Sequence, residues 1–349
     1  GIWILMDYRT AGVDIDAGNE AVRRIKTLAR STFTSGVLSD IGSFGGIFRF
    51  DPGRFRDPVL VSSADGVGTK LKVAFLVGRH DTIGVDLVNH CVNDILVQGA
   101  EPLFFFDYLA TSQLSPDLAE EVVGGIAAAC RENGCALLGG ETAETPGLYA
   151  PGEYDLAGFI VGAADRERLL TGQNISPGDV LIGVPSSGLH TNGYSLVRRI
   201  VFDQFRLSVD NHIPDLGMTI GEALLEPHRS YLSLLKPLIN RNRVKGIAHI
   251  TGGGITDNLP RVLPQGTAAV VDCSTWQVPA IFEWLHRSGD VPTEDMLRTF
   301  NMGIGMVLVA DTGQKEQILE ELAARGGHDA QVIGEVIAAD TPQVTYTNL

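Results

Sequence analysis

The sequence contains few cysteines, and their spacing excludes the usual cysteine-based metal site. Four are present among 349 residues, namely Cys91, Cys130, Cys135 and Cys273. No two of them form a CxxC pair, so a structural zinc site is not expected. All four have apolar neighbours in the sequence, as free core cysteines usually do. We therefore expect reduced cysteines in the core of a cytoplasmic protein.

Long hydrophobic runs are also absent. No stretch approaches the roughly 18 consecutive apolar residues of a transmembrane helix. The apolar segment from Gly1 to Met6 is too short for the hydrophobic part of a signal peptide, and it lacks a basic flank. One interpretation is that Met6 is the native start and that residues 1–5 are an addition. We expect neither a membrane span nor a secretion signal.

An excess of basic residues is missing as well. The chain carries 42 acidic and 27 basic residues, which gives a net charge of −15. Binding to a nucleic-acid backbone or to an anionic membrane depends on clustered lysine and arginine, so neither partner is expected. An anionic ligand would need a local pocket.

The composition that remains predicts a globular protein with two domains. Hydrophobic residues make up 44% of the chain, and domains typically span about 100 to 200 residues. The turn-rich segment Asn174 to Asp179 indicates a boundary, which we place near residue 170, so that the domains cover 1–170 and 171–349. Strands and helices mix in both halves, which predicts an α+β or α/β fold, and we favour α+β.

Hydrophobic periodicity locates the elements of both halves. The clearest helix spans 81–98, with an apolar stripe on one face and Asp81 or Thr82 available as its cap. Its other faces carry the polar residues Asp86, His90, Asn93 and Asp94, several of them on one side. Further helices are predicted at 17–30, 116–132, 194–205 and 224–239. Strands are predicted at 103–110, 136–138, 155–162, 180–184, 248–250, 268–272, 304–310 and 331–336.

Three acidic residues lie where elements end or on the polar side of a helix. Asp65 belongs to "ADGVGTK", Asp94 to "CVNDILVQG" and Glu141 to "LGGETAE". Carboxylates flanked by glycine suit Mg²⁺ held on a polyphosphate, because the ligand can approach the backbone. Lys70 with Thr69 or Thr142 could donate to phosphate oxygens. A structural alternative stays open, since Asp-Gly is a common turn dipeptide and Glu141 could cap the next segment.

The second half carries two glycine-rich loops, "SSGLHTNG" at 186–193 and "ITGGGITDN" at 250–258. Hydroxyls, backbone amides and a helix N-terminus together form an anion cradle, and two such loops suggest a phosphorylated small molecule. His190 is a candidate for binding substrate or moving a proton, although a lone histidine in a loop is more often structural. Neither GxxxxGK[ST] nor GxGxxG occurs, so the phosphate site must use another fold.

Several stretches together resemble one enzyme family. They are "DGVGTKL", "VNDILVQGAEPLFFFDYLA", "LLGGETAETPGLY", "YDLAGFIVG", "PSSGLHTNGYSLVR", "HITGGGITDNLPRVLP" and "RTFNMGIGMVL". In this order they are similar to phosphoribosylformylglycinamidine cyclo-ligase, also called AIR synthetase, of purine biosynthesis. The resemblance runs from about Tyr8 to the C-terminus. Ser43 and Thr145 depart from the residues common in the family, which affects only loop geometry.

The resemblance implies a fold, an assembly and a reaction. The N-terminal domain would form a β-barrel jointly with that of a second copy, with helices outside, and the C-terminal domain would be α/β. ATP with Mg²⁺ would drive ring closure of formylglycinamidine ribonucleotide to 5-aminoimidazole ribonucleotide, releasing ADP and phosphate. The formyl amide oxygen would be phosphorylated before an amidine nitrogen attacks.

The resemblance also implies roles for residues that match the family motifs. The metal ligands would be Asp65, Asp94 and Glu141. The nucleotide would contact Lys26, Gly42, Gly45, Gly46, Thr69, Lys70, Asp94, Glu141 and Thr142. The substrate would contact Ser187, His190, Asn192, Gly252, Gly253 and Gly254. The catalytic residues would be Asp65, Lys70 and His190, with His190 moving a proton.

Two kinds of alternative remain. Selenophosphate synthetase resembles this architecture but usually has a reactive cysteine in its N-terminal glycine-rich segment, whereas the first cysteine here is Cys91. Thiamine-phosphate kinase typically has paired acids where this chain has "GSFGG". A non-catalytic nucleotide-binding or dimerisation module would be expected to lose the acids or one anion loop, and both sets are present.

Overall fold

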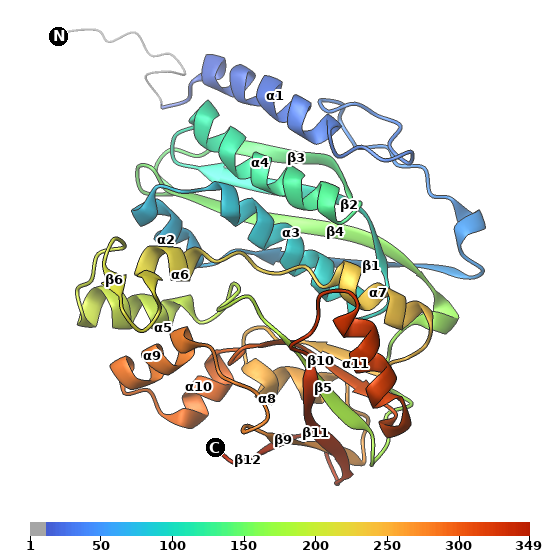
Figure 1. Ribbon diagram of the computed structural model, residues 1–349. Helices are drawn as coiled ribbons and strands as arrows, with labels where there is room; N and C mark the ends of the chain where they lie inside the picture. The colour runs from blue at the N-terminus through green and yellow to red at the C-terminus, as the bar shows by residue number, and fades with distance from the viewer. Residues whose placement is uncertain (1–11) are drawn as a thin grey trace, which may run out of the picture.

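Alternating apolar residues build the first of two large sheets in a computed structural model that describes residues 12–349 (Figure 1). This sheet has the order β1-β4-β2-β3, with β2 and β3 parallel and the other pairs antiparallel. Its strands are β1 (Pro58–Gly66), β2 (Glu101–Thr111), β3 (Ala136–Glu144) and β4 (Tyr154–Asp165). The segment Gly1 to Met6 lies outside the described residues.

Helices cover one face of this sheet. The apolar stripe of α3 (Asp81–Leu96) packs on β1, β2 and β4, while α4 (Pro116–Glu132) packs on α3, and α1 (Ile15–Arg30) on α4. The α3–α4 crossing is very close, because a Cβ at Gly84 would stand 2.3 Å from the backbone oxygen of Val122. These helices fall near the predicted ranges, but the predicted cap of α3 is wrong, since its first flanking residue is His80 and no side chain caps it.

Within residues 12–349 most of the opposite face of the first sheet is uncovered and apolar, although Phe48 packs on Phe104 there. Leu60 on β1, Phe159 on β4 and Tyr108 on β2 are 67%, 47% and 40% exposed. They alternate with residues that face the helices, such as Val61 and Phe105, as the two-residue period of a strand requires. An uncovered apolar sheet face of this kind suits a protein partner.

The second half is built on a six-stranded mixed sheet in the order β12-β9-β11-β5-β10-β8. Strand β10 is buried throughout and β5 at every residue except Pro185, as expected for strands covered on both faces. The strands are β5 (Val180–Pro185), β8 (Gly246–His249), β9 (Thr267–Asp272), β10 (Ile304–Ala310), β11 (Gln331–Ala338) and β12 (Val344–Thr347). The boundary that we place near residue 170 lies in the segment that links the two sheets.

Two helices predicted in the second half are interrupted. The predicted helix at 224–239 is two helices, α6 (Ile220–Leu225) and α7 (Leu232–Asn240), because Pro227 disfavours a helical conformation at Glu226. The predicted helix at 194–205 is α-helical only in α5 (Tyr194–Arg198), and then continues as a π-helix at Arg199–Gln204. The other helices are α8 (Gly254–Asn258), α9 (Ala280–Gly289), α10 (Thr293–Thr299) and α11 (Lys315–Ala323). A short hairpin pairs β6 (His212–Ile213) with β7 (Met218–Thr219).

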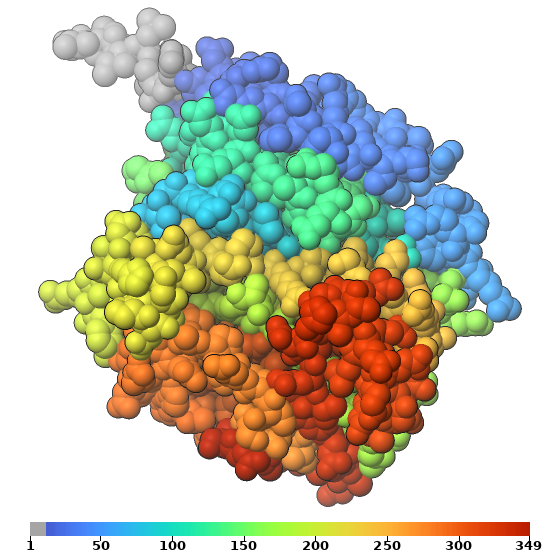
Figure 2. Space-filling view, in the orientation of Figure 1, coloured from blue at the N-terminus to red at the C-terminus, as the bar shows by residue number. Residues whose placement is uncertain are grey.

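The two halves are in contact along a broad surface, and α2 (Lys70–Val77) lies where they meet (Figure 2). The sequence does not predict this helix, because its first residues follow a glycine-rich segment that suits a phosphate loop. The cysteines are free: three are buried, and Cys273 is only half-buried, contrary to the expectation of four core residues. Across residues 12–349, none of the helices combines the length and apolar character that a bilayer crossing requires.

Candidate active site

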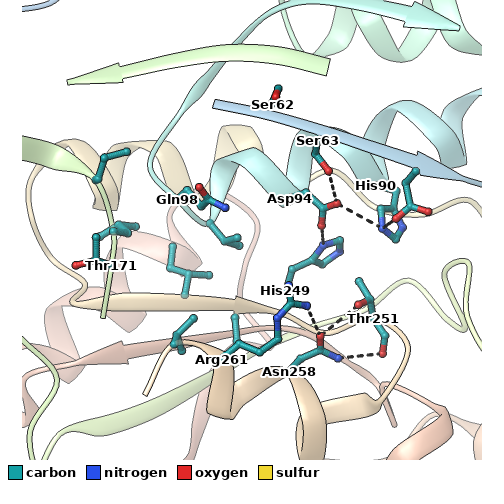
Figure 3. Close-up of a pocket in the computed structure, with 17 residues that line it drawn as sticks. Ser62, Ser63, His90, Asp94, Gln98, Thr171, His249, Thr251, Asn258 and Arg261 are labelled. Atoms are coloured by element: carbon teal, nitrogen blue, oxygen red, sulfur yellow. Dashed lines mark hydrogen bonds and ion pairs between the residues drawn. The ribbon is translucent and has the colours of Figure 1, made fainter. Parts of the chain in front are cut away.

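A pocket of about 540 Å³ opens between the two halves (Figure 3). The first half contributes Asp65, His90 and Asp94 to its walls, and the second half contributes His249 and Arg261. Leu169 and Leu170, from the segment that links the sheets, complete one side. Carboxylates, imidazoles and a guanidinium therefore meet at the junction of the halves.

Local structure explains how these side chains converge. Asp65 lies near the end of β1 and points to the helix-covered face of the sheet, where it meets α3. His90 and Asp94 are four residues apart on α3, so they share one side of the helix. His249 is the last residue of β8, and the glycine-rich turn follows directly. Prediction of a polar side on this helix is confirmed for His90 and Asp94.

Hydrogen bonds connect these groups through Asp94 (Figure 3). Its Oδ1 lies 2.8 Å from Nδ1 of His249, and its Oδ2 accepts a hydrogen bond of 2.9 Å from Oγ of Ser63. Nε2 of His90 lies 2.6 Å from Oδ2 of Asp65 and 3.7 Å from Oδ2 of Asp94. Burial opposes a charge on His90, but the two carboxylates outweigh this effect and raise the pKa of His90.

A second layer of histidines lies behind the pocket wall. His228 Nε2 is 3.2 Å from His249 Nε2, and the His190 ring stacks on His228 with their centroids 4.0 Å apart. Burial shifts the pKa values of His190 and His228 well below 6.5, so both rings are neutral at pH 7. Sequence analysis missed His228 and His249. The only signal for His249 was its place in a predicted strand shortly before a triple-glycine turn.

His190 itself does not reach the pocket. It is completely buried, and its Nε2 accepts a hydrogen bond from the backbone N–H of Ser187. Its Nδ1 has no partner, and the ring is absent from the pocket wall. In this conformation His190 does not line the pocket, and its catalytic role stays a prediction.

Lys70, a predicted phosphate contact, is turned to other partners in this structure. This side chain is fully buried, and Nζ donates to Oδ1 of Asp86 at 2.9 Å. It also donates to the backbone oxygens of His190 and Glu226, at 2.9 and 2.8 Å. Because all three N–H donors are used, none remains for a phosphate oxygen. Lys70 instead ties α2 to two loops of the second half.

Glu141 and the glycine loop form a separate pocket of about 260 Å³. Gly42, Gly45, Gly46 and Thr142 line it together with Glu141, as the predicted nucleotide group requires. Lys26 reaches over this loop, since a Cβ at Gly42 would lie 3.1 Å from Nζ of Lys26. The predicted nucleotide residues are thus not gathered in one place, because Asp94 lines the first pocket and Thr69 and Lys70 line neither.

Within one chain, Glu141 cannot join Asp65 at a single metal ion. Asp65, Gly158, Asp107 and Gly140 lie in one row across the sheet. Three strand intervals of about 4.8 Å place the row's ends roughly 14 Å apart. Glu141 follows Gly140 and points to the uncovered face, whereas Asp65 points to the helices. The expectation that three carboxylates meet is therefore not fulfilled by the single chain.

The remaining predicted residues surround the two loops of the second half. Oγ of Ser187 donates to the backbone oxygen of Pro227. A Cβ on Gly252 would stand 3.3 Å from Oδ1 of Asn192, so these predicted substrate contacts are neighbours. Gly253 and Gly254 continue the same turn into α8. Oγ1 of Thr69 lies 3.3 Å from Oγ of Ser195 on α5, and Thr69 lines neither pocket.

Comparison with known proteins gives the relationships of the whole chain. Residues 49–164 and 176–347 match the N-terminal and C-terminal domains of the AIR synthase related protein family. A phosphoribosylformylglycinamidine cyclo-ligase from Trichlorobacter lovleyi is 54% identical, and the alignment covers 94% of each chain. One from Syntrophotalea carbinolica is 50% identical, over 98% of each chain.

Solved structures of lower identity share the fold. Thiamine-monophosphate kinase from Stenotrophomonas maltophilia superposes with a TM-score of 0.68 at 19% identity, covering 93% of this chain and 95% of the other. Hydrogenase maturation protein HypE, solved in complex with ATP, gives a TM-score of 0.62 at 18% identity, with 93% and 90% covered. At such identities the likeness extends to the fold alone. The close relatives decide the family, and the chain belongs to the AIR synthase family of phosphoribosylformylglycinamidine cyclo-ligases.

Proposed function

We propose that the protein uses ATP to close the imidazole ring of 5-aminoimidazole ribonucleotide from formylglycinamidine ribonucleotide. One observation carries the proposal: an interdomain pocket lined by Asp65 and Asp94 occurs in a chain that is 54% identical to a named cyclo-ligase. The second half faces the same pocket with Arg261 and Thr251, a cation and a hydroxyl suited to a phosphorylated substrate.

The donor set of the pocket is compatible with Mg²⁺. This ion is usually held by one or two carboxylates together with substrate phosphates and water. Asp65 and Asp94 lie on the same wall, and their side chains are 40% and 27% exposed, so both can be approached from the pocket. When bound, Mg²⁺ would neutralise charge on the triphosphate during transfer. The protein HypE was solved with ATP, which supports nucleotide use in this fold.

Ring closure needs a good leaving group on the formyl carbon. Transfer of the γ-phosphoryl group to the amide oxygen would create one, after which the amidine nitrogen attacks that carbon, phosphate leaves and a proton is released. The chain's contribution is to position the two substrates and stabilise charge, because phosphoryl transfer requires little covalent chemistry from a protein. Asp65 and Asp94 would orient the nucleotide end, and Arg261 would neutralise the anionic substrate.

A second copy of the chain is part of this proposal. The uncovered apolar face that includes Leu60, Phe159 and Tyr108 suits packing against the same face of another chain, which would give the expected homodimer. Glu141 and the glycine loop lie at this side of the sheet, so Glu141 would meet the partner. We also propose a cytoplasmic location, which the free cysteines support.

A coupled assay tests the proposed reaction. ADP should appear only when both ATP and formylglycinamidine ribonucleotide are present, together with aminoimidazole ribonucleotide in equal amount. Asp94→Asn should lower kcat on the order of 10²- to 10³-fold, the cost of removing a preorganised charged group. Asp215→Asn, at an exposed acid remote from the pocket, is the matched control. Absence of substrate-dependent ADP, or normal turnover by Asp94→Asn, would contradict the proposal.

A further inference from the structure

The pocket wall contains a compact group of nitrogen and oxygen donors. His90, Asp94 and His249 each offer one ligand atom, and these atoms lie within 4.8 Å of one another. Both imidazoles are almost completely buried, with side chains 6% and 4% exposed, whereas Asp94 opens to the pocket. Asp65 stands beside them, with its Oδ2 2.6 Å from Nε2 of His90. Figure 3 shows His90 and His249 both next to Asp94, each joined to it by a dashed line.

The outer nitrogens of these rings are held by a second set of contacts. Nδ1 of His90 lies 2.9 Å from Oγ1 of Thr191, and Nδ1 of His228 lies 3.3 Å from the same oxygen. Nε2 of His249 lies 3.2 Å from Nε2 of His228. One assignment of hydrogens satisfies all three contacts with neutral rings: His90 and His228 donate from Nδ1 to the threonine, and His249 donates from Nε2 to His228.

This assignment leaves two lone pairs directed at carboxylates. Nε2 of His90 then faces Asp65 at 2.6 Å and Asp94 at 3.7 Å without a hydrogen, and Nδ1 of His249 faces Asp94 at 2.8 Å without one. Lone pairs that face a carboxylate repel it, so this assignment belongs to the state in which a cation lies among the groups; without a cation, a hydrogen on each of these nitrogens donates to the carboxylates instead. Histidines that bind metals typically donate their other ring N–H to a neighbouring acceptor, and Thr191 and His228 are placed to accept in this way.

The donor type points to a transition metal. We propose that His90, Asp94 and His249 bind a divalent ion of the Zn²⁺ class, with Asp65 available as a fourth ligand. Imidazole suits Zn²⁺ and its transition-metal neighbours, whereas Mg²⁺ prefers oxygen ligands alone. Ligand atoms in a tetrahedral site with bonds near 2.1 Å stand roughly 3.4 Å apart. The present separations of 2.6, 2.8 and 3.7 Å lie on both sides of that value.

The site shares Asp94 with the proposed nucleotide pocket, and only in this respect does it rest on the proposed function. An ion of the Zn²⁺ class held by His90 and His249 would occupy the carboxylate that Mg²⁺-nucleotide needs. The two ions would therefore compete, and the proposed site would make the enzyme sensitive to transition metals. Binding itself requires neither ATP nor turnover, so it can be measured separately from the reaction.

Titration of the metal-stripped, full-length protein with Co²⁺ tests the site without nucleotide. We expect visible absorption of a four- or five-coordinate ion that saturates at one Co²⁺ per chain and withstands excess Mg²⁺. His249→Ala should abolish this signal, while His212→Ala, at an exposed histidine outside the pocket, should preserve it. Circular dichroism checks that each variant is folded.

A change outside the ligand set keeps the test decisive if a histidine variant fails to fold. Thr191→Val removes the acceptor of His90 and should weaken Co²⁺ binding about 10- to 100-fold, whereas Thr191→Ser should retain it. Equal binding by wild type and His249→Ala, equal binding by the two Thr191 variants, or displacement by equimolar Mg²⁺ would each overturn the proposed site. Loss of substrate-dependent ADP production with Co²⁺ binding intact would instead count against the proposed reaction alone.

Discussion

The buried ion pair between Lys70 and Asp86 should make a large contribution to stability when only one partner is removed. Both side chains are 0% exposed, with Nζ and Oδ1 separated by 2.9 Å. Lys70→Met leaves the Asp86 carboxylate with one hydrogen bond, from the backbone N–H of His228, while its Oδ2 has no partner. Breaking such a buried pair typically costs about 3 to 5 kcal/mol.

The protonation state of Asp86 determines how much stability Lys70→Met loses within the range of about 3 to 5 kcal/mol. Burial already raises the pKa of Asp86 to about 6 with the lysine present. Without the lysine the pKa rises further, so the carboxyl group in the folded variant is neutral at low pH. A raised folded-state pKa means that stability falls as pH increases above the unfolded value. The loss caused by Lys70→Met should therefore be smaller at pH 5 than at pH 8.

Urea unfolding followed by circular dichroism measures this loss. Lys72→Met is the matched control, because Lys72 lies on the same helix but pairs with Glu153 at the surface, with side chains 40% and 29% exposed. Exposed pairs contribute only about 0 to 1 kcal/mol. The double change Lys70→Met with Asp86→Leu should recover part of the loss. If Lys70→Met and Lys72→Met lose equal stability, the reasoning about the buried pair is refuted.

Three further predictions concern other parts of the molecule. Phe159→Glu should convert the proposed dimer into a monomer in analytical ultracentrifugation, whereas Phe205→Glu, at a side chain of similar exposure, should not; an unchanged dimer would exclude this face. Burial raises the pKa of Asp107 from 3.8 to about 7. The free energy of unfolding of the wild type should therefore decrease between pH 3.8 and pH 7 relative to that of Asp107→Asn, by at most roughly 4 kcal/mol. Parallel pH profiles of the two proteins would argue against this. Gly254→Ala should reduce the free energy of unfolding by more than about 1 kcal/mol beyond the reduction caused by Gly266→Ala. Both glycines have a positive φ, but only at Gly254 would the added Cβ lie 2.0 Å from a backbone oxygen. Equal losses in the two variants would contradict this packing argument.

Sequence patterns predicted those helices and strands whose position depends only on neighbouring residues in the chain. The apolar stripe of α3 requires only a 3.6-residue period, and the helix was therefore predicted within two residues at its end. The same period put His90 and Asp94 on one side of the helix. Helix α2 was missed, because "TKLKVAFLV" carries no side-chain cap and follows a glycine-rich segment.

The face on which Glu141 lies could not be predicted from the sequence. The pairing of β2 with β3 shifts by one residue between Phe105 and Phe106. Without this shift Glu141 would lie opposite Leu109 and point to the helices, but with it Glu141 lies opposite Tyr108 on the uncovered face. A one-residue shift reverses the direction of every following side chain, and it is decided by packing across the sheet.

The contact of His228 and His249 with His90 could not be predicted from the sequence for a related reason. His228 precedes α7 and His249 ends β8, so neither has a periodic pattern that relates it to His90 on α3. Their meeting depends on how the two halves dock. Conversely, the loop sequence that singled out His190 describes its backbone rather than its access to ligand, since tertiary packing places the ring in the interior.

The contacts of Lys70 have a consequence for how the two halves can diverge in sequence. In the second half its partners are main-chain oxygens, of His190 and Glu226, and Asp86 likewise receives a main-chain N–H. Side chains along those loops can therefore be substituted without loss of the contacts of Lys70 and Asp86, provided that the backbone conformation is preserved. Chimaeras that graft a distant homologue's C-terminal half should assemble when loop lengths agree and fail when one residue is inserted.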